Sequence, residues 1–299
     1  MTQTLRKYLL VIKPGIVAGN LVSVAGGFLL AAGGRIDGAL LAATIFGTSL
    51  VVASGCIFNN CIDRHLDRKM VRTQNRVMAR GLIALWVACC YATLLGLGGV
   101  GLLLATTNKL TTAIAIVGFA DYVVIYSLWL KQASVYSILV GSLSGATPPL
   151  VGYCAVRGRL DMGAIILLAI FALWQIPHAY AIALYRRQDY TAAAIPMLPL
   201  RGEIGAARRQ IISYILAYTA AASMLTFGGY AGYGYLTAVM VAGLGWLGLA
   251  WAGYTTGQER LWARRIFIFS VASITLLSLM MAIDGTSPFA AHLLATTLP

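Results

Sequence analysis

Nine apolar blocks, each long enough to cross a lipid bilayer as a helix, dominate this sequence of 299 residues. About 20 consecutive apolar residues span the hydrocarbon core of a membrane in the α-helical conformation. The expected limits of the blocks are 16–32, 39–59, 82–105, 110–130, 134–156, 163–184, 210–227, 231–254 and 266–283. No long polar linker separates them. The pattern predicts an all-α, polytopic membrane protein with a single transmembrane domain over residues 1–299.

Charged residues are scarce and unevenly placed along the chain. They make up 10% of the sequence, against roughly a quarter of a typical soluble domain. If the nine spans alternate in direction, all but four of the 22 Lys and Arg residues fall on one side of the membrane; the four are Arg35, Lys109, Arg157 and Arg159. The positive-inside rule then predicts a cytoplasmic N-terminus and a C-terminus outside. The same asymmetry explains the net charge of +13 without a nucleic-acid partner.

The N-terminal residues and the cysteines bear on the cellular compartment. The segment MTQTLRKYLL has neither a cleavable signal pattern nor an Arg- and Ser-rich transit peptide, which favours a bacterial cytoplasmic (inner) membrane. The five cysteines lack C-x-x-C spacing and mostly lie within the predicted spans. We expect buried, apolar thiols rather than disulfides or a cysteine metal site.

A charged stretch, NNCIDRHLDRKMVRTQNR, directly follows the second apolar block. If that span continues as a helix beyond the membrane, Asn59, Asp63 and Asp67 share one face, because residues four apart are neighbours on a helix. Two carboxylates and an amide oxygen suit Mg²⁺, which leaves its other positions to water and substrate phosphates. The spacing therefore predicts a magnesium site at the end of the second span.

Arginines repeat the same spacing at positions 64, 68, 72 and 76. On a continuous helix they would form a second column beside the oxygen column. Because guanidinium groups bind phosphate oxygens bidentately, metal and arginines together predict a substrate that carries a diphosphate. The pattern leaves one alternative open, a juxtamembrane helix whose Asp and Arg residues pair with each other and with anionic lipid headgroups.

A second stretch on the same predicted side, FALWQIPHAYAIALYRRQDYTAAAIPMLP, covers residues 171–199. Pro177 should kink the sixth span. His178 then lies at membrane depth, where ionisable residues are usually functional; a hydrogen-bonded core histidine is the alternative. Arg186 and Asp189 follow at the membrane edge, so the two stretches are expected to close over one diphosphate.

These stretches resemble a known family. N-x-x-x-D-x-x-x-D at Asn59–Asp67 is similar to the first Asp-rich motif of the UbiA superfamily of intramembrane prenyltransferases. The continuation to Arg76, the second stretch, VIKPGIVAGNLVSVAGG and GSLSGATPPLVGY resemble the branch of that superfamily that farnesylates haem. The resemblance runs from about Tyr8 to Met281. It implies nine helices around a central cavity, and transfer of the farnesyl group of farnesyl diphosphate to a vinyl group of haem b. Water adds in the same reaction to give haem O, with Mg²⁺ as cofactor.

The chemistry of that reaction suggests residue roles. We assign Mg²⁺ to Asn59, Asp63, Asp67 and Asp189, the diphosphate to Arg68, Arg72, Arg76, Lys131 and Arg186, and the haem iron to His178. The family's second motif is usually D-x-x-x-D, whereas Ala193 stands four residues after Asp189, so the number of metal ions stays open. The alternative for Lys131 is a lysine that contributes only to the positive charge of the cytoplasmic loops and has no role in the site. His65 is expected to be solvated and His292 to be inert.

Five aromatic residues in the spans are candidates for lining the cavity and stabilising a carbocation: Tyr126, Trp129, Trp174, Tyr180 and Tyr185. Two other functions compete with haem farnesylation. One is prenylation of an aromatic acid or a quinone precursor. The other is transport of an anion, which the position of both Asp stretches at one membrane edge disfavours, since transporter sites usually lie near the midplane. Expected partners are the lipid bilayer, farnesyl diphosphate, haem b, and a haem A synthase or terminal oxidase assembly factor.

Overall fold

The computed structural model describes residues 3–201, 204–255 and 257–286, and their regular structure is helical. Within these ranges nine helices are long and apolar enough to cross a membrane, which confirms the predicted number of spans. They are α2 (Pro14–Ala32), α3 (Gly38–Lys69), α4 (Leu85–Thr106), α5 to α6 (Lys109–Ala133), α7 (Ser137–Arg157), α8 (Met162–Tyr185), α11 (Ile204–Phe227), α12 to η2 (Tyr233–Tyr254) and α13 (Glu259–Ile283). The described residues also form three separate short helices: α1 (Gln3–Val11), α9 (Arg187–Ala192) and α10 (Leu198–Arg201).

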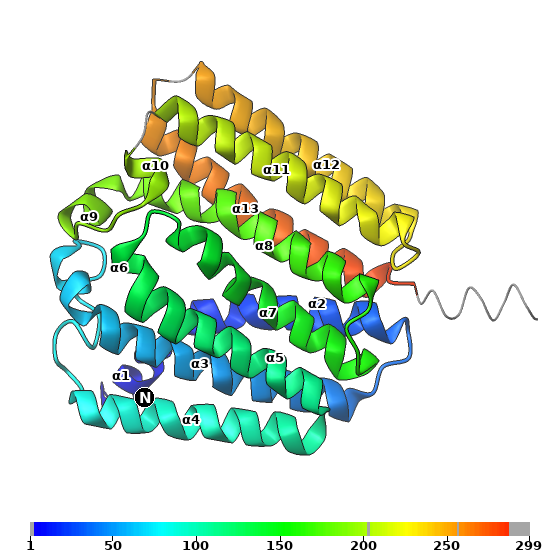
Figure 1. The fold of residues 1–299 in the computed structure, drawn as a ribbon, viewed down its shortest axis with the longest axis horizontal. Coiled ribbons are helices and arrows are strands. Elements are labelled where there is room, and N and C mark those ends of the chain that lie inside the picture. The colour runs from blue at the N-terminus through cyan, green and yellow to red at the C-terminus, as the bar shows by residue number, and fades with distance from the viewer. Residues whose placement is uncertain (1–2, 202–203, 256, 287–299) are drawn as a thin grey trace, which may run out of the picture.

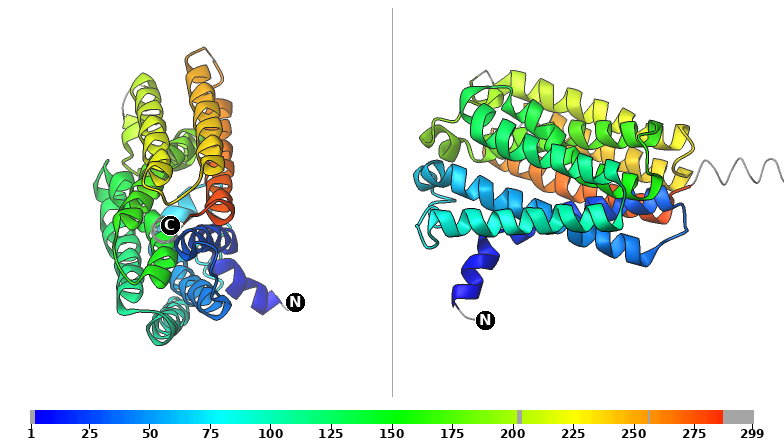
Figure 2. Two further views of the ribbon diagram at one scale, coloured as in Figure 1. Left: turned by 90° about the vertical axis from the view of Figure 1, so that its right-hand side faces the viewer. Right: turned by 60° about the horizontal axis from the view of Figure 1, so that its bottom comes forward.

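The long helices lie side by side in one bundle (Figures 1 and 2). Helix α2 packs on α7 and α13, helix α3 on α4, and helix α8 on α7, α11 and α13. The turns that follow α3 and the short helices α6, α9 and α10 gather at one end of the bundle, at the left of Figure 1. Both charged stretches therefore lie at the same end, as their sequence positions predicted.

Several helix ends differ from the predicted limits. Helices α11 and α13 begin at Ile204 and Glu259, earlier than the expected 210 and 266. Both helices carry arginines in these extra turns, so the limits of the apolar blocks gave helices that were too short. Helix α3 continues to Lys69, which confirms that the second span extends through the oxygen column. The third and fifth spans begin slightly later than expected, at Leu85 and Ser137.

A π-helical segment, η1 (Asp121–Leu130), interrupts the fourth span. The Ser127 hydroxyl donates to the Tyr122 carbonyl, five residues earlier, at 2.7 Å. Such π segments widen the helical turn and often occur at functional sites. Here the segment brings Tyr122 beside Gly55 and Ser127 beside Asn59, both on α3, whereas Tyr126 lies beside Gly141 of α7. Lys131 follows the segment directly.

Glycines allow α2 and α7 to pack with their backbones in contact. A Cβ atom on Gly27 would lie 2.1 Å from the Pro149 carbonyl oxygen, and one on Gly152 would lie 2.1 Å from the Val24 carbonyl oxygen. Small residues at such positions are the usual way in which membrane helices approach closely. This contact joins α2 and α7, which both contribute residues to the wall of the central cavity.

Replacing Gly27 with alanine is expected to destabilise the protein by roughly 1–3 kcal/mol, the usual cost of overpacking. The backbone oxygen of Pro149 cannot move aside as a side chain would. The midpoint of thermal unfolding in detergent measures the change. Gly98→Ala is the matched control, because a Cβ there meets nothing within 4 Å. Equal midpoints for the two variants would contradict the close packing of α2 on α7.

Candidate active site

A cavity of about 600 Å³ lies in the centre of the bundle, between α2, α3, α5, η1, α7, α8 and α13. Its wall at the end that holds the charged stretches is polar and contains Lys13, Asn59, Asp63, Asp67, Arg72, Arg76 and Lys131. Toward the middle of the same helices the wall becomes apolar, with Val51, Phe119, Val151, Phe171 and Ile274. One chamber thus joins a charged pocket to an apolar one.

The oxygen column lies on one face of α3 and lines the charged pocket. Asn59, Asp63 and Asp67 are 3%, 2% and 1% exposed. The Asn59 amide Nδ2 donates to Asp63 Oδ2 at 3.0 Å and to Ser127 Oγ at 2.9 Å. Helical spacing therefore aligns the three side chains as predicted, and η1 holds them from the opposite side.

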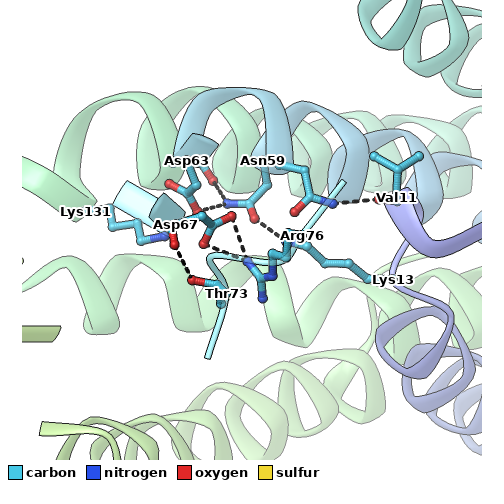
Figure 3. Close-up of polar contacts among 10 residues, drawn as sticks. Val11, Lys13, Asn59, Asp63, Asp67, Thr73, Arg76 and Lys131 are labelled. Atoms are coloured by element: carbon cyan, nitrogen blue, oxygen red, sulfur yellow. Dashed lines mark hydrogen bonds and ion pairs between the residues drawn. The ribbon is translucent and has the colours of Figure 1, made fainter. Parts of the chain in front are cut away.

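Each member of the column contacts one cation, as Figure 3 shows. Lys131 Nζ pairs with Asp63, and Lys13 Nζ donates to Asn59 Oδ1. Arg76 Nη1 bonds both carboxylate oxygens of Asp67, at 3.0 and 3.1 Å. Three cations face two carboxylates and an amide, so this cluster carries an excess of positive charge. Such a cluster favours an anionic ligand.

Lys13 was not predicted as a site residue. It lies between α1 and α2 with a left-handed backbone (φ 54°). Non-glycine residues rarely adopt this conformation, and those that do often lie at functional sites. Burial, and secondarily the charge of Arg76, lowers the pKa of Lys13 to about 8. The only signal in the sequence is a lysine directly before Pro14 at the start of the first span.

The predicted column of four arginines is wrong. Helix α3 ends at Lys69, so Arg72 and Arg76 belong to the following turns and reach the cavity from there. Arg64 Nη1 donates to the Cys61 carbonyl at 2.8 Å, and Arg68 Nε donates to the Ala79 carbonyl at 2.7 Å. Arg64 and Arg68 are not part of the cavity wall; Arg68 instead holds the turns against the end of α3.

The second stretch contributes only some of its expected residues. Trp174, Gln175, His178 and Tyr190 line the cavity. Asp189 is buried in α9 but is not in the cavity wall, and Arg186 lies with Cζ 4.3 Å from the centre of the Tyr185 ring. Among the described residues no group of three or more His, Cys, Asp or Glu side chains is arranged to hold a metal. The structure therefore does not bring Asp189 together with Asp63 and Asp67.

The aromatic candidates divide in the same way. Tyr126 and Trp174 line the cavity. Trp129 is 65% exposed on the outer surface, Tyr180 is buried in the core beside Tyr214, and Tyr185 lies by Arg186. Those three predictions are wrong. Aromatic side chains that were not predicted complete the wall: Phe119, Tyr122, Phe171, Tyr190 and Phe267.

The remaining predictions concern histidine and cysteine. Helix α8 continues through Pro177, and His178 Nδ1 lies 2.7 Å from Ser270 Oγ. His65 is exposed, as expected, and His292 lies outside the described residues. All five cysteines are free thiols; Cys56, Cys61 and Cys154 are buried as predicted, whereas Cys89 is half-buried and Cys90 is exposed.

The chemistry of the column suits a hard divalent cation. Asp63 Oδ1 is buried and has no hydrogen-bond partner in the described structure. Carboxylate and amide oxygens are the ligands that Mg²⁺ takes, together with phosphate oxygens of a substrate. An ion at Asp63 would give this oxygen the partner that it lacks, with Asn59 and Asp67 as the neighbouring donors.

The fold and the cavity define an all-helical, multi-pass membrane protein whose central cavity joins a charged pocket to an apolar one. The sequence profile of the UbiA prenyltransferase family matches residues 20–297. Protoheme IX farnesyltransferase 2 of Chromobacterium violaceum is 56% identical over 284 residues, which cover 95% of this chain and 94% of that protein. The chain belongs to the UbiA prenyltransferase family.

Solved structures share the fold at low sequence identity. A structure of digeranylgeranylglyceryl phosphate synthase superposes with a TM-score of 0.78 at 16% identity, covering 95% of this chain and 99% of that one. A UbiA homologue from Archaeoglobus fulgidus bound to GPP and Mg²⁺ gives a TM-score of 0.59 at 13% identity, covering 93% and 99%. Both likenesses bear on the fold alone.

Proposed function

We propose that this protein transfers the farnesyl group of farnesyl diphosphate to a vinyl group of haem b, with addition of water, and releases haem O and diphosphate. The observation that carries the proposal is the chamber itself, in which a cationic, oxygen-rich pocket opens into an apolar one that contains His178. A relative with 56% identity that carries the name protoheme IX farnesyltransferase supports the same substrate pair.

The charged pocket would bind the diphosphate. Arg72, Arg76, Lys131 and Lys13 supply cations to its oxygens, and Asn59, Asp63 and Asp67 would hold Mg²⁺. The bound ion would withdraw charge from the leaving diphosphate. The A. fulgidus homologue was solved with GPP and Mg²⁺, which are a prenyl diphosphate and the ion proposed here. Arg68, Arg186 and Asp189 lie at the same end of the bundle but outside the cavity wall. We propose that Arg68 and Arg186 contribute to diphosphate binding and Asp189 to Mg²⁺ binding from that position.

The apolar pocket would hold the two reacting carbon groups away from water. The C1–O bond of farnesyl diphosphate breaks with its electron pair on the diphosphate, and the terminal vinyl carbon of haem b bonds to C1. A water molecule then adds its oxygen to the inner vinyl carbon and loses a proton. Aromatic faces such as those of Phe119, Tyr122 and Tyr126 stabilise positive charge on the allylic group, and His178 binds the haem.

We also propose an environment for the protein. The N-terminus would lie in the cytoplasm and the C-terminus outside, in a bacterial inner membrane, with the whole chain as one domain; the excess of basic residues in the loops of one side supports this orientation. A product fixed in the membrane would pass to another membrane protein, for which a haem A synthase or a terminal oxidase assembly factor is the expected recipient.

Haem extracted from cells with and without this protein tests the proposal. A haem that is heavier by one farnesyl group and one hydroxyl should appear only when the protein is present. Identical haem profiles, together with a prenylated aromatic acid or quinone precursor, would assign the other prenyltransferase activity. Accumulation of an unmodified anion in vesicles, without any prenylated product, would assign transport.

Replacing Lys13 with methionine is expected to raise the KM for farnesyl diphosphate about 10- to 100-fold, because a buried charged hydrogen bond to phosphate contributes roughly 1.5–3 kcal/mol. Haem affinity should stay unchanged. Steady-state kinetics in detergent measure the effect. Lys109→Met removes an exposed lysine at the start of α5, on the opposite side of the predicted topology, and serves as the matched control. Wild-type KM values in both variants would exclude Lys13 from the diphosphate site.

A further inference from the structure

We propose that Ser270 is a positioning residue for His178. It holds the imidazole in the tautomer with the proton on Nδ1, so that Nε2 presents its lone pair to the cavity. The tautomer is inferred from contacts within the protein alone. Only the identity of the group that accepts the Nε2 lone pair, haem iron, rests on the proposed function.

The hydroxyl of Ser270 has two close neighbours and only one hydrogen. Ser270 Oγ lies 2.6 Å from the Phe267 carbonyl oxygen and 2.7 Å from His178 Nδ1. A carbonyl oxygen can only accept, so the serine hydrogen is used in the bond to Phe267. The contact with His178 then requires a hydrogen on Nδ1, which donates to the serine oxygen.

This tautomer leaves a single free acceptor on the ring. A neutral imidazole carries one N–H, so a proton on Nδ1 leaves Nε2 with its lone pair. Neutral imidazole nitrogen is the common ligand for metals, and the hydrogen bond made by the other nitrogen decides which one coordinates. Metal-bound histidines usually donate the second N–H to a protein oxygen, as His178 does to Ser270.

The surroundings of the ring determine the direction in which Nε2 points. Ser270 is fully buried and is not part of the cavity wall, whereas His178 is. The Nδ1 edge of the ring therefore faces α13, and the opposite edge, with Nε2, reaches the cavity. Trp174 stacks on the imidazole at 4.7 Å between ring centres, and Phe267 lies at 5.2 Å.

A second hydrogen bond fixes this arrangement. Trp174 Nε1 donates to the backbone carbonyl of Ser270 at 2.9 Å. Helices α8 and α13 are thus joined through both the side chain and the backbone of one serine, and the histidine ring lies between two aromatic rings that also line the cavity. A planar metal chelate, with its open axial position toward Nε2, is the class of ligand that this geometry accepts.

Nitrogen NMR of the ligand-free protein tests the tautomer directly. The chain has three histidines, so ¹⁵N-histidine labelling and a His178→Ala reference identify the signals of His178. Wild-type protein should show the proton on Nδ1. Ser270→Ala should give the Nε2–H form or a mixture, and Ser270→Thr, which keeps the hydroxyl, should restore the wild-type pattern.

A haem titration followed at the Soret band tests the consequence. Ser270→Ala should weaken haem binding about tenfold, as for other residues that orient a metal ligand, and leave farnesyl diphosphate affinity unchanged. Ser273→Ala, which removes another buried hydroxyl of α13, is the control and should bind haem normally.

The outcomes separate this inference from the proposed function. A wild-type proton on Nε2, or a Soret titration of Ser270→Ala equal to wild type, would overturn the role of Ser270. The wild-type tautomer decides the matter even if Ser270→Ala does not fold. An Nδ1 proton in a protein that never modifies haem would keep the tautomer and reject the proposed substrate.

Discussion

Replacing Asp67 with asparagine is expected to abolish prenyl transfer while the protein still folds. Asp67 is one of only two carboxylates in the oxygen column, and a bound metal ion contributes several kcal/mol to stabilising a leaving group. Turnover should fall by about three orders of magnitude, since each 1.36 kcal/mol corresponds to a factor of ten. Release of diphosphate from labelled farnesyl diphosphate, measured with Mg²⁺ and with excess chelator, gives the result.

Asp63→Asn should show the same loss of turnover and a larger loss of stability. It leaves Lys131 buried without its carboxylate partner, whereas Asp67→Asn leaves Arg76, whose side chain is 29% exposed, in partial contact with solvent. Asp37→Asn is the control for both, because Asp37 caps the other end of α3 and asparagine caps helices equally well. Full activity of either column variant, or of wild type in chelator, would remove Mg²⁺ from the site.

Replacing His178 with alanine is expected to weaken haem binding at least tenfold and to suppress product formation. The His178 imidazole lines the cavity and carries a nitrogen that can coordinate iron. Loss of an axial ligand changes both the affinity for haem and the position of the Soret band. A haem titration with absorption spectroscopy measures both quantities, and the affinity for farnesyl diphosphate should stay at the wild-type value.

His65→Ala provides the comparison. His65 is exposed on α3, so this substitution removes an imidazole ring from the protein surface instead of from the cavity. It should bind haem as wild type does. An unchanged Soret band and unchanged affinity in His178→Ala would make His178 a structural residue and would leave another group to orient the haem. Reduced affinity in both variants would point to a general loss of structure.

The number of spans and the alignment of the oxygen column were predictable from the sequence. A helix that spans a bilayer requires a long apolar run of sequence. Asn59, Asp63 and Asp67 are four residues apart, so helical geometry alone places them on one face. The prediction of an arginine column was wrong because no residue type between positions 59 and 76 signals that α3 ends at Lys69. The helix ends where Met70 becomes extended and Thr73 Oγ1 donates to the Asp67 carbonyl at 3.1 Å, a contact that depends on the folded turn.

The cavity wall was harder to predict, for a physical reason. Membrane helices are apolar toward lipid as well as toward the core, so hydrophobic periodicity does not reveal the inward face. Trp129 and Tyr126 lie three residues apart in η1, yet one faces outward and the other the cavity. The contribution of Lys13 depends on its left-handed backbone, and the positions of Asp189 and Arg186 depend on tertiary packing.

Incubating the purified protein in lipid vesicles with farnesyl diphosphate, haem b and Mg²⁺ is the most direct test of haem farnesylation. Mass spectrometry of the extracted haem should show the gain of one farnesyl group and one hydroxyl. One diphosphate should be released for each haem that is converted, and Asp67→Asn should give neither product. Unmodified haem from active wild-type protein, with the labelled prenyl group on an added aromatic acid instead, would contradict it.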